Sequence, residues 1–135
     1  MTGQAQAMFA GDVASQSLGM ELVQAGEGTA VVRMRITGQM VNGYDIAHGG
    51  YVFMLADTAF GCACNTHGAA TVGAGAEISF VTSARLGDEL VATAELRTRY
   101  GRNGIYDVTI RRDRDIIAEF RGRSRATNSA APEVP

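Results

Sequence analysis

The residue with the clearest chemical potential is Asp57, an acid in the middle of the most apolar stretch of the chain, residues 48–65. An ionised carboxylate that loses its hydration without gaining a partner is strongly unfavourable, and its pKa rises. A sequence that keeps an acid there therefore has a use for it. Asp57 either makes a structural polar contact, for example with Thr58 or a neighbouring chain, or it acts as a base or nucleophile.

The segment before Asp57 supplies a second feature, a glycine-rich helix start. Residues 37–47 read as a loop that contains the turn signal Asn42-Gly43. The loop delivers the chain to His48-Gly49-Gly50, where glycines permit close approach of another group to the backbone. We predict a helix over residues 50–65. Because it is apolar on almost every side, we expect a central helix that other structure surrounds.

The rest of the chain has the pattern of β-strands. Alternating apolar and polar residues predict strands over residues 20–25, 29–36, 77–82, 89–99, 104–112 and 116–125. The first two form a hairpin, and the last four are expected to follow one another antiparallel, as a meander over much of their length. A short helix over residues 8–18 precedes them, and residues 126–135 are expected to form a disordered tail.

This order of elements predicts an α+β fold in which a curved antiparallel sheet wraps one long helix. A chain of 135 residues fits one domain, 1–135, with its core at about residues 15–125. One helix cannot both cover a sheet and shield its own far side. Pairing of two copies about a two-fold axis is therefore expected.

The charge of the chain excludes several classes of function. Its net charge is −2 and its pI is near 5.6, so we expect no general attraction to nucleic acid or anionic membranes. All twelve basic residues are arginine, and most lie between Arg97 and Arg125. These arginines either cover the solvent face of a sheet or bind phosphates through their planar forks.

The cysteine content argues for a reducing compartment. Cys62 and Cys64 lie two positions apart on the expected helix, which points them to different faces and argues against a disulfide. Neither histidine has ligand spacing to them, so we expect buried reduced thiols and no metal. The sequence has no export signal and no apolar run of membrane-spanning length. These observations predict a cytoplasmic protein.

Several motifs together carry a family resemblance over about residues 15–125. They are Met40-Val41-Asn42-Gly43, His48-Gly49-Gly50, Leu55-Ala56-Asp57-Thr58-Ala59-Phe60 and Asn65. In their spacing and in the strand order the chain closely resembles hotdog-fold thioesterases of the PaaI type. That resemblance implies a hotdog fold, a homotetramer built from two dimers, and hydrolysis of acyl-CoA thioesters, with phenylacetyl-type esters as the emblematic substrates. It implies water as the only co-substrate, without metal or organic cofactor.

The resemblance also assigns residue roles. Asp57 would activate water or attack the thioester carbon, and the Gly49 N–H would bind the thioester oxygen. His48 and Asn42 would shape that turn. Apart from the resemblance, the Thr58 hydroxyl either orients a catalytic water or bonds back to the preceding helical turn, as threonines often do. General chemistry agrees, because a helix N-terminus offers unpaired N–H groups to a developing oxyanion.

The CoA-binding residues follow less directly. Phosphates need cationic or N–H donors near the surface. The candidates are Thr82, Ser83, Arg85, Arg99, Arg102 and Asn103. The sequence departs from the common family pattern at Ser83, where a proline often follows the strand. It departs again at Asp113-Arg114-Asp115, where a glycine turn is usual.

The spacing of the two central groups predicts an oligomeric site. Gly49 and Asp57 stand eight positions apart on one helix, which is roughly 12 Å of axial rise and too far for both to engage one carbonyl group. If two helices lie antiparallel about a two-fold axis, Asp57 of one subunit can meet Gly49 of the other.

Two points stay open at this level. A noncatalytic acyl-CoA-binding module would share the fold, whereas a dehydratase is disfavoured because the sequence has only His48 and His67 to supply a histidine–carboxylate dyad. The acyl pocket is also undefined. Tyr51, Phe53, Met54 and Phe60 either line it or belong to the core.

Overall fold

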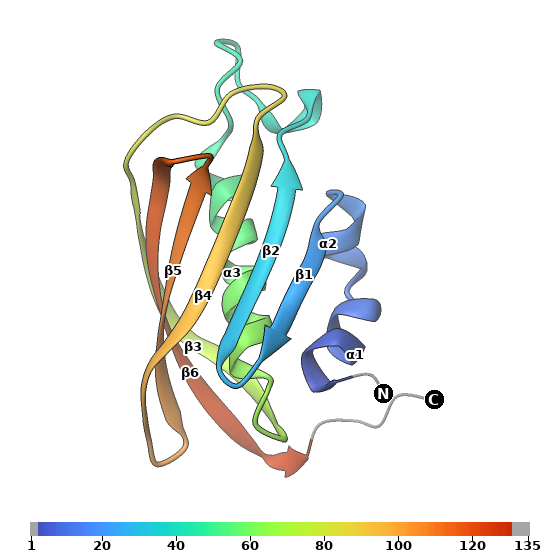
Figure 1. The fold of residues 1–135 in the computed structure, drawn as a ribbon, viewed down its shortest axis with the longest axis vertical. Coiled ribbons are helices and arrows are strands. Elements are labelled where there is room, and N and C mark those ends of the chain that lie inside the picture. Colours follow the sequence, from blue (N-terminus) through green and yellow to red (C-terminus); the bar gives the residue numbers. More distant parts are fainter. Residues whose placement is uncertain (1–2, 131–135) are drawn as a thin grey trace.

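The computed structural model describes residues 3–130, which form one antiparallel sheet around a long helix (Figure 1). In chain order the elements are α1 (Gln4–Ala10), α2 (Val13–Ser17), β1 (Glu21–Gly26), β2 (Thr29–Arg35), the 3₁₀ turn η1 (Gly38–Met40), α3 (Gly49–Cys64), β3 (Ala69–Phe80), β4 (Glu89–Tyr100), β5 (Asn103–Arg112) and β6 (Asp115–Ala130). The strand order is β1-β2-β4-β5-β6-β3. The predicted α+β fold is confirmed.

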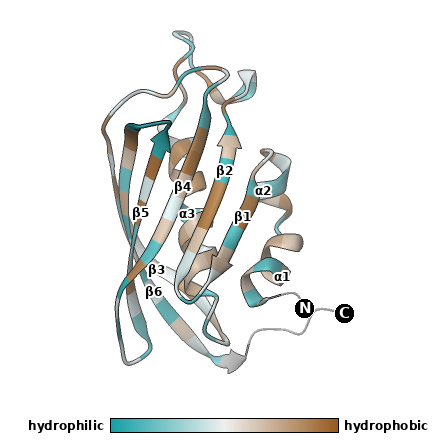
Figure 2. Ribbon diagram, in the orientation of Figure 1, coloured by the Kyte–Doolittle hydropathy of each residue, from teal (hydrophilic) through white to brown (hydrophobic). Residues whose placement is uncertain are grey.

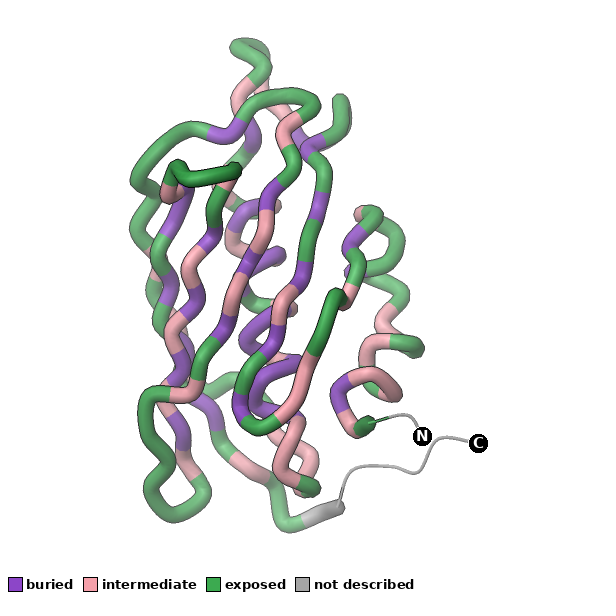
Figure 3. Tube along the Cα trace, in the orientation of Figure 1, coloured by how far each residue is buried: buried purple, intermediate pink, exposed green. Residues whose placement is uncertain are grey.

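Alternating side chains divide the sheet into an inner and an outer face. Buried and partly exposed positions alternate along the first half of β4 and most of β5 (Figure 3). The inward side chains, each at most 1% exposed, are Leu90, Ala92, Ala94, Tyr106, Val108 and Ile110. These apolar side chains form one core with α3, and Figure 2 shows the matching apolar bands on β2, β4 and the helix. Their burial is the main force that holds the layers together.

The place of β3 differs from the expected meander. Strands β4, β5 and β6 do follow one another, but β3 pairs with β6 at the far edge of the sheet and not with β4. It also begins at Ala69, well before residue 77, because residues 69–76 pair with β6. This first half consists mainly of small residues without clear alternation, so the sequence pattern did not reveal it. An irregular register between Gly73 and Gly75 lets this half follow β6. One long edge of the sheet is therefore β3.

Small residues let α3 lie close to the inner face of the sheet. The helix side that includes Leu55, Ala56 and Ala59 is fully buried. Phe60 rests on Gly122 of β6, where an added Cβ would come within 2.8 Å of the ring. The same ring packs against Tyr106 and Phe120, with centroids 5.7 and 5.8 Å away. Of the acyl-pocket candidates, Phe60 is therefore core.

The opposite side of α3 is open, contrary to the expectation of a helix surrounded on almost every side. Five positions that remain partly or fully exposed in the single chain form one stripe, Gly50, Phe53, Met54, Asp57 and Gly61, and the partly exposed Gly49, Tyr51 and Thr58 lie beside it. Their spacing of three or four residues places them in one row along the helix. The sheet curves around the other side, and at the edge of the row the Phe53 ring packs against Phe120 of β6, with ring centroids 5.4 Å apart. We refer to this row below as the open stripe.

Two further expectations about the termini are corrected. The helix expected over residues 8–18 is two helices, because Asp12 caps a new start and accepts a hydrogen bond from the Ser15 N–H at 3.0 Å. The tail expected from residue 126 is part of β6 as far as Ala130, paired with the early half of β3. Residues 131–135 of that tail lie outside the described part of the chain.

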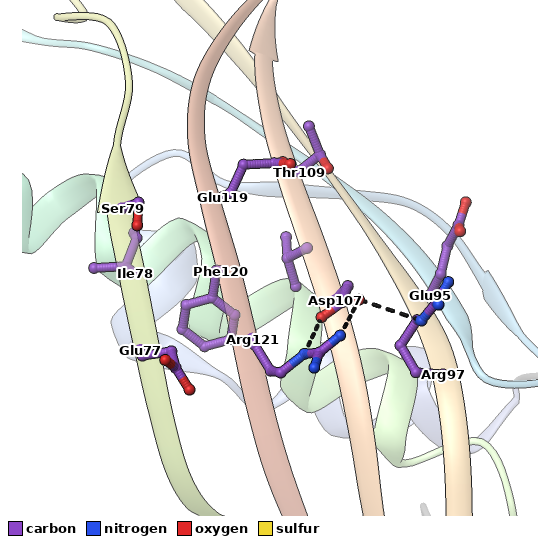
Figure 4. Close-up of a pocket in the computed structure, with 11 residues that line it drawn as sticks. Glu77, Ile78, Ser79, Glu95, Arg97, Asp107, Thr109, Glu119, Phe120 and Arg121 are labelled. Atoms are coloured by element: carbon purple, nitrogen blue, oxygen red, sulfur yellow. Dashed lines mark hydrogen bonds and ion pairs between the residues drawn. The ribbon is translucent and has the colours of Figure 1, made fainter.

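The arginines of the C-terminal third mostly cover the outer face of the sheet. The Arg121 guanidinium donates two hydrogen bonds, of 2.7 and 2.9 Å, to the Asp107 carboxylate, and Arg97 forms an ion pair with the same carboxylate at 3.4 Å (Figure 4). Arg123 pairs with Glu77 at 3.0 Å. Arg97, Asp107, Arg121 and Glu77 border a shallow hollow of about 600 Å³ on the sheet. The solvent-face interpretation is confirmed for these arginines.

Asn65 closes the C-terminal end of α3, as its position in the sequence suggested. Its side-chain NH₂ donates to the carbonyl oxygens of Gly61 and Thr71, both at 2.9 Å. Its side-chain oxygen accepts from the Thr71 N–H at 2.9 Å and from Gln4 at 3.2 Å. One buried amide thus joins α3, β3 and α1.

Replacing Asn65 by Ala is expected to lower the free energy of unfolding by about 2–3 kcal/mol, because the part-buried N–H and C=O of Thr71 and the Gly61 carbonyl lose the partner that the buried amide gives them. Urea unfolding at fixed protein concentration measures this change. Asn128→Ala, at an exposed position of β6, is the matched control, and its effect should stay within about 0.5 kcal/mol. Equal effects of the two variants would contradict the role given to Asn65.

Candidate functional site

The loop before α3 is held by its own backbone and by Asn42. The Asn42 side-chain oxygen accepts from the N–H groups of Tyr44 and Ile46, at 2.8 and 3.2 Å. The His48 N–H donates to the Met40 carbonyl at 2.8 Å. Asn42 therefore shapes the turn, and the loop reaches α3 in a fixed geometry.

The N-terminus of α3 is left uncapped by this loop. His48 occupies the N-cap position with extended backbone, and its exposed side chain makes no capping hydrogen bond. The first N–H groups of a helix have no partner within the helix. The N–H of Gly49 and the positive end of the helix dipole are thus available to a negatively charged or carbonyl oxygen.

A cavity of about 340 Å³ adjoins Gly49. Its lining is mostly apolar, with two hydroxyl groups from the loop after β3: Ile46, Ala47, Gly49, Val52, Phe80, Val81, Thr82, Ser83, Ala84 and Ile117. The ring of Phe80 covers Gly49 so closely that an added Cβ would lie 2.8 Å from it. Glycine at this position therefore lets an aromatic ring and the helix start share one cavity.

Asp57 lies on the open stripe of α3, in the second half of the helix. Within residues 3–130 no side chain or backbone group forms a hydrogen bond or ion pair with its carboxylate. Although solvent reaches it, the surrounding chain removes part of its hydration, and this desolvation raises the pKa of Asp57 above 3.8. A carboxylate with spare lone pairs and reduced hydration is suited to take a proton or attack a carbonyl carbon.

Gly49 and Asp57 do not meet within one chain. Both belong to the same uninterrupted α3, so eight residues at 1.5 Å each separate them by about 12 Å along the axis. Phe53 and Met54, two of the acyl-pocket candidates, lie on the open stripe between them. Tyr51 is partly buried near the helix start.

Thr58 is tied to the N-terminal helices. Its Oγ1 lies 2.8 Å from the Ser15 Oγ, and the Ser15 hydroxyl lies 2.6 Å from the Asp12 carboxylate. Thr58 makes no other hydrogen bond to the described residues. Its hydroxyl thus bonds to α2 and not back to the preceding turn of its own helix.

The six candidates for CoA binding fall into two groups at opposite ends of the sheet. Thr82, Ser83 and Arg85 follow β3 and lie at the Gly49 end, whereas Arg99, Arg102 and Asn103 lie at the hairpin between β4 and β5 (Figure 1). All but Asn103 are exposed. One chain alone does not bring the two groups together.

The other reactive side chains gather at the C-terminal end of α3. His67 Nε2 lies 3.2 Å from the Tyr106 hydroxyl. Burial raises the pKa of Tyr106 to about 12, and burial together with the nearby Arg99 lowers the pKa of His67. Cys62 and Cys64 are buried free thiols whose pKa burial raises to about 12. Within the described residues no cluster of three or more His, Cys, Asp or Glu side chains has a metal-binding arrangement.

Three residues near the site were not found by sequence reasoning. Asp12 and Ser15 have a recognisable signal, an aspartate three positions before a residue in a helix's first turn, which is the pattern of an N-cap. Phe80 has no such signal, because its approach to Gly49 depends on tertiary packing.

None of the helices in residues 3–130 is long and apolar enough to cross a membrane.

Comparison with known proteins decides the family. The family model of the Thioesterase superfamily matches residues 44–118, from the loop before α3 to β6. The chain belongs to this superfamily. The prediction of a thioester-hydrolysing enzyme is thereby confirmed, and the uncapped helix start and the open-stripe acid both lie inside the matched region.

Individual thioesterase relatives support the PaaI-type resemblance. The chain is 42% identical over 121 residues to the acyl-coenzyme A thioesterase PaaI of Escherichia coli K12, covering 89% of this chain and 86% of that protein. The structure of the E. coli PaaI protein from the phenylacetic acid degradation operon matches with a TM-score of 0.91 and 40% identity, over 94% and 93% of the two chains. A mutant of the phenylacetic acid degradation protein PaaI of Thermus thermophilus matches with a TM-score of 0.83 and 26% identity, over 86% and 100%. The expected hotdog fold is confirmed.

The buried thiols give a direct test of the packing around α3. A pKa raised from 9.0 to about 12 lowers the thiolate fraction at pH 8 by roughly a thousandfold. We expect negligible reaction of the native protein with a disulfide reagent such as DTNB at pH 8. In guanidinium both thiols should react at the rate of free cysteine. Fast reaction of either thiol in the native protein would contradict the described packing.

Proposed function

We propose that this protein is an acyl-CoA thioesterase that hydrolyses the thioester to a free acid and CoA. The observation that carries the proposal is the pairing, on one helix, of an uncapped N-terminus with an unpartnered carboxylate. The 42% identity to an acyl-coenzyme A thioesterase over most of both chains supports the substrate class. The names of two relatives refer to phenylacetic acid degradation. This favours phenylacetyl-CoA, or another aromatic or short-to-medium acyl-CoA, as the substrate.

The chemistry assigns complementary roles to the two groups. The Gly49 N–H would polarise the thioester carbonyl and stabilise the oxyanion that forms on attack. Asp57 would act on the carbonyl carbon, either as the base that deprotonates water or as the nucleophile. The Phe80 ring and the apolar cavity would exclude water from the Gly49 N–H, which strengthens that hydrogen bond. No step requires a metal or an organic cofactor.

Two copies are needed to complete this site. The open stripe of α3 and the unpaired long edge of β3 both lie on surfaces that a second copy can cover. With two α3 helices antiparallel about a two-fold axis, Asp57 of one subunit faces Gly49 of the other, and Phe53 and Met54 lie between them.

The same arrangement accounts for the separation of the CoA-binding candidates. Thr82, Ser83 and Arg85 of one subunit would approach Arg99, Arg102 and Asn103 of its partner, because antiparallel pairing places opposite ends of the two sheets together. The assembly proposed is a homotetramer of two such dimers. We place it in the cytoplasm, where its reduced cysteines would persist.

Loss of Asp57 is expected to abolish turnover. Asp57→Asn and Asp57→Ala should lower kcat by about a thousandfold or more at every pH. Since Asp57 acts as an anion, wild-type kcat/KM should fall as the pH falls through the pKa of Asp57. The midpoint of that fall should lie above pH 3.8, the ordinary pKa of an aspartate.

The measurement is thiol release from phenylacetyl-, hydroxybenzoyl-, short-chain and medium-chain CoA esters. Aromatic esters are expected to give the highest kcat/KM. If the wild type binds these esters tightly but does not hydrolyse them, the protein is a noncatalytic acyl-CoA-binding module and not an enzyme. Unchanged turnover in Asp57→Asn would remove Asp57 from the chemistry.

Mixed dimers test the shared site. In a heterodimer of an Asp57→Asn subunit with a Gly49→Pro subunit, one site keeps both groups intact, so about half of the wild-type activity should return. Proline fits the first position of a helix and removes the N–H. Both proline and alanine at position 49 bring a Cβ to within 2.8 Å of the Phe80 ring, so Gly49→Ala, which keeps the N–H, measures the effect of that contact alone. Both homodimers of the mixing variants should be inactive. Verified heterodimers without activity would show that each chain builds its own site.

A further inference from the structure

A chain of three hydrogen-bonding groups connects α2 to the residue next to Asp57. The Asp12 carboxylate accepts from the Ser15 N–H at 3.0 Å and from the Ser15 hydroxyl at 2.6 Å. The Ser15 Oγ then lies 2.8 Å from the Thr58 Oγ1. Ser15, at the centre of this chain, is 1% exposed, whereas Asp12 and Thr58 are partly buried.

The number of protons fixes the direction of this chain. An ionised carboxylate only accepts hydrogen bonds, and a serine hydroxyl has a single proton to donate. The short contact to Asp12 uses the Ser15 proton, as expected for a charge-assisted bond. Ser15 can therefore only accept from Thr58, and the Thr58 proton points toward α2. The remaining lone pairs of the Thr58 oxygen are left as acceptors.

The position of Thr58 makes this direction relevant to catalysis. Thr58 follows Asp57 directly and is half-buried at the border of the open stripe. Asp12 also acts on Cys62, four residues further along the helix, where its charge contributes to the raised thiol pKa. The Asp12 charge therefore lies near the side of α3 that borders the open stripe.

We propose that Asp12 and Ser15 are positioning residues that hold the Thr58 hydroxyl as a hydrogen-bond acceptor for the water that Asp57 deprotonates. The proposal rests on the proposed thioesterase function and assigns Asp57 the role of base. A Thr58 hydroxyl free to rotate would also donate into a lone pair of that water and weaken it as a nucleophile. The chain from Asp12 removes this orientation.

The reaction then proceeds with balanced protons and electrons. The water gives one proton to Asp57 and donates its other O–H to Thr58, while its free lone pair attacks the thioester carbon. The carbonyl electrons move to the oxygen bound by the Gly49 N–H of the partner subunit. When the tetrahedral intermediate collapses, the C–S bond breaks, and the leaving thiolate takes the proton from Asp57. The products are the free acid and the CoA thiol.

Asp12→Asn tests the direction of the chain with little change in shape. Asparagine is as good an N-cap as aspartate, so its oxygen can keep the Ser15 N–H and preserve α2. Its NH₂ group would then donate to the Ser15 Oγ, which reverses the chain and makes Thr58 the acceptor from Ser15 and a donor toward the water. We expect kcat about tenfold lower with KM and Tm unchanged.

A double-mutant cycle with Thr58→Val separates this role from simple support of the helix. Valine keeps the shape of threonine but has no hydroxyl, so if Asp12 acts through Thr58, Asp12→Asn should lower kcat no further in that background. Thr58→Ser should retain activity. Ser17→Ala, which removes the exposed hydroxyl bond to the Ala14 carbonyl within the same α2, is the control and should leave kcat unchanged.

Two results would overturn the proposal: wild-type kcat in Asp12→Asn, or losses from Asp12→Asn and Thr58→Val that multiply. If Asp12→Asn lowers Tm more than Ser17→Ala does, the double-mutant cycle with Thr58→Val is repeated with Ser15→Ala in place of Asp12→Asn. Losses in kcat that multiply would again overturn the proposal. Failure of the thioesterase function itself would be seen separately, as a wild-type protein that releases no thiol from any acyl-CoA.

Discussion

The stiffness of α3 is the constraint on which the proposed site depends. One helix carries the proposed oxyanion donor at its first residue and the proposed carboxylate at its ninth. An α-helix fixes the distance between such positions, so no side-chain rotation or loop movement within the chain brings the two groups onto one carbonyl. With the roles proposed for Gly49 and Asp57, the two groups of one site come from two helices. What the rest of the chain does is hold one helix at a defined depth and leave one of its sides uncovered.

Each element around α3 contributes to this placement. The small residues of the helix and Gly122 of β6 set the depth, because larger side chains would push α3 away from the sheet. The Asn42 turn brings the chain to His48 without capping the first N–H groups. At the other end, the Asn65 amide joins the helix to β3 and α1. The N-terminal helices hold Thr58 from the side. Among the described residues, the open stripe is the long side of α3 left without such support.

Sequence patterns predicted those parts of this fold that depend on local chemistry. The β1–β2 hairpin follows from Glu27 and Gly28, both of which adopt positive φ, and β4 and β5 follow from strict alternation. The acid in an apolar run and the glycine-rich helix start identified Asp57 and Gly49. What spacing does not encode is the pairing of distant segments. The early start of β3 and the late end of β6 were both missed, and they have one cause, because Ala69 pairs with Ala130 and Thr71 with Ala126. For the same reason, the sequence did not reveal that the CoA-binding candidates lie at two ends of the sheet or that Phe80 covers Gly49.

The arginine-rich outer face has a consequence for an enzyme that handles activated acyl groups. Thioesters transfer their acyl group to free amines, and the side chain most exposed to this damage is lysine. Every side-chain cation of this protein is a guanidinium, which stays protonated and is a poor nucleophile. The ion pairs that cover the sheet need positively charged side chains, and arginine supplies that charge without an amine. The surface that meets the substrate in solution offers no side-chain amine for it to acylate.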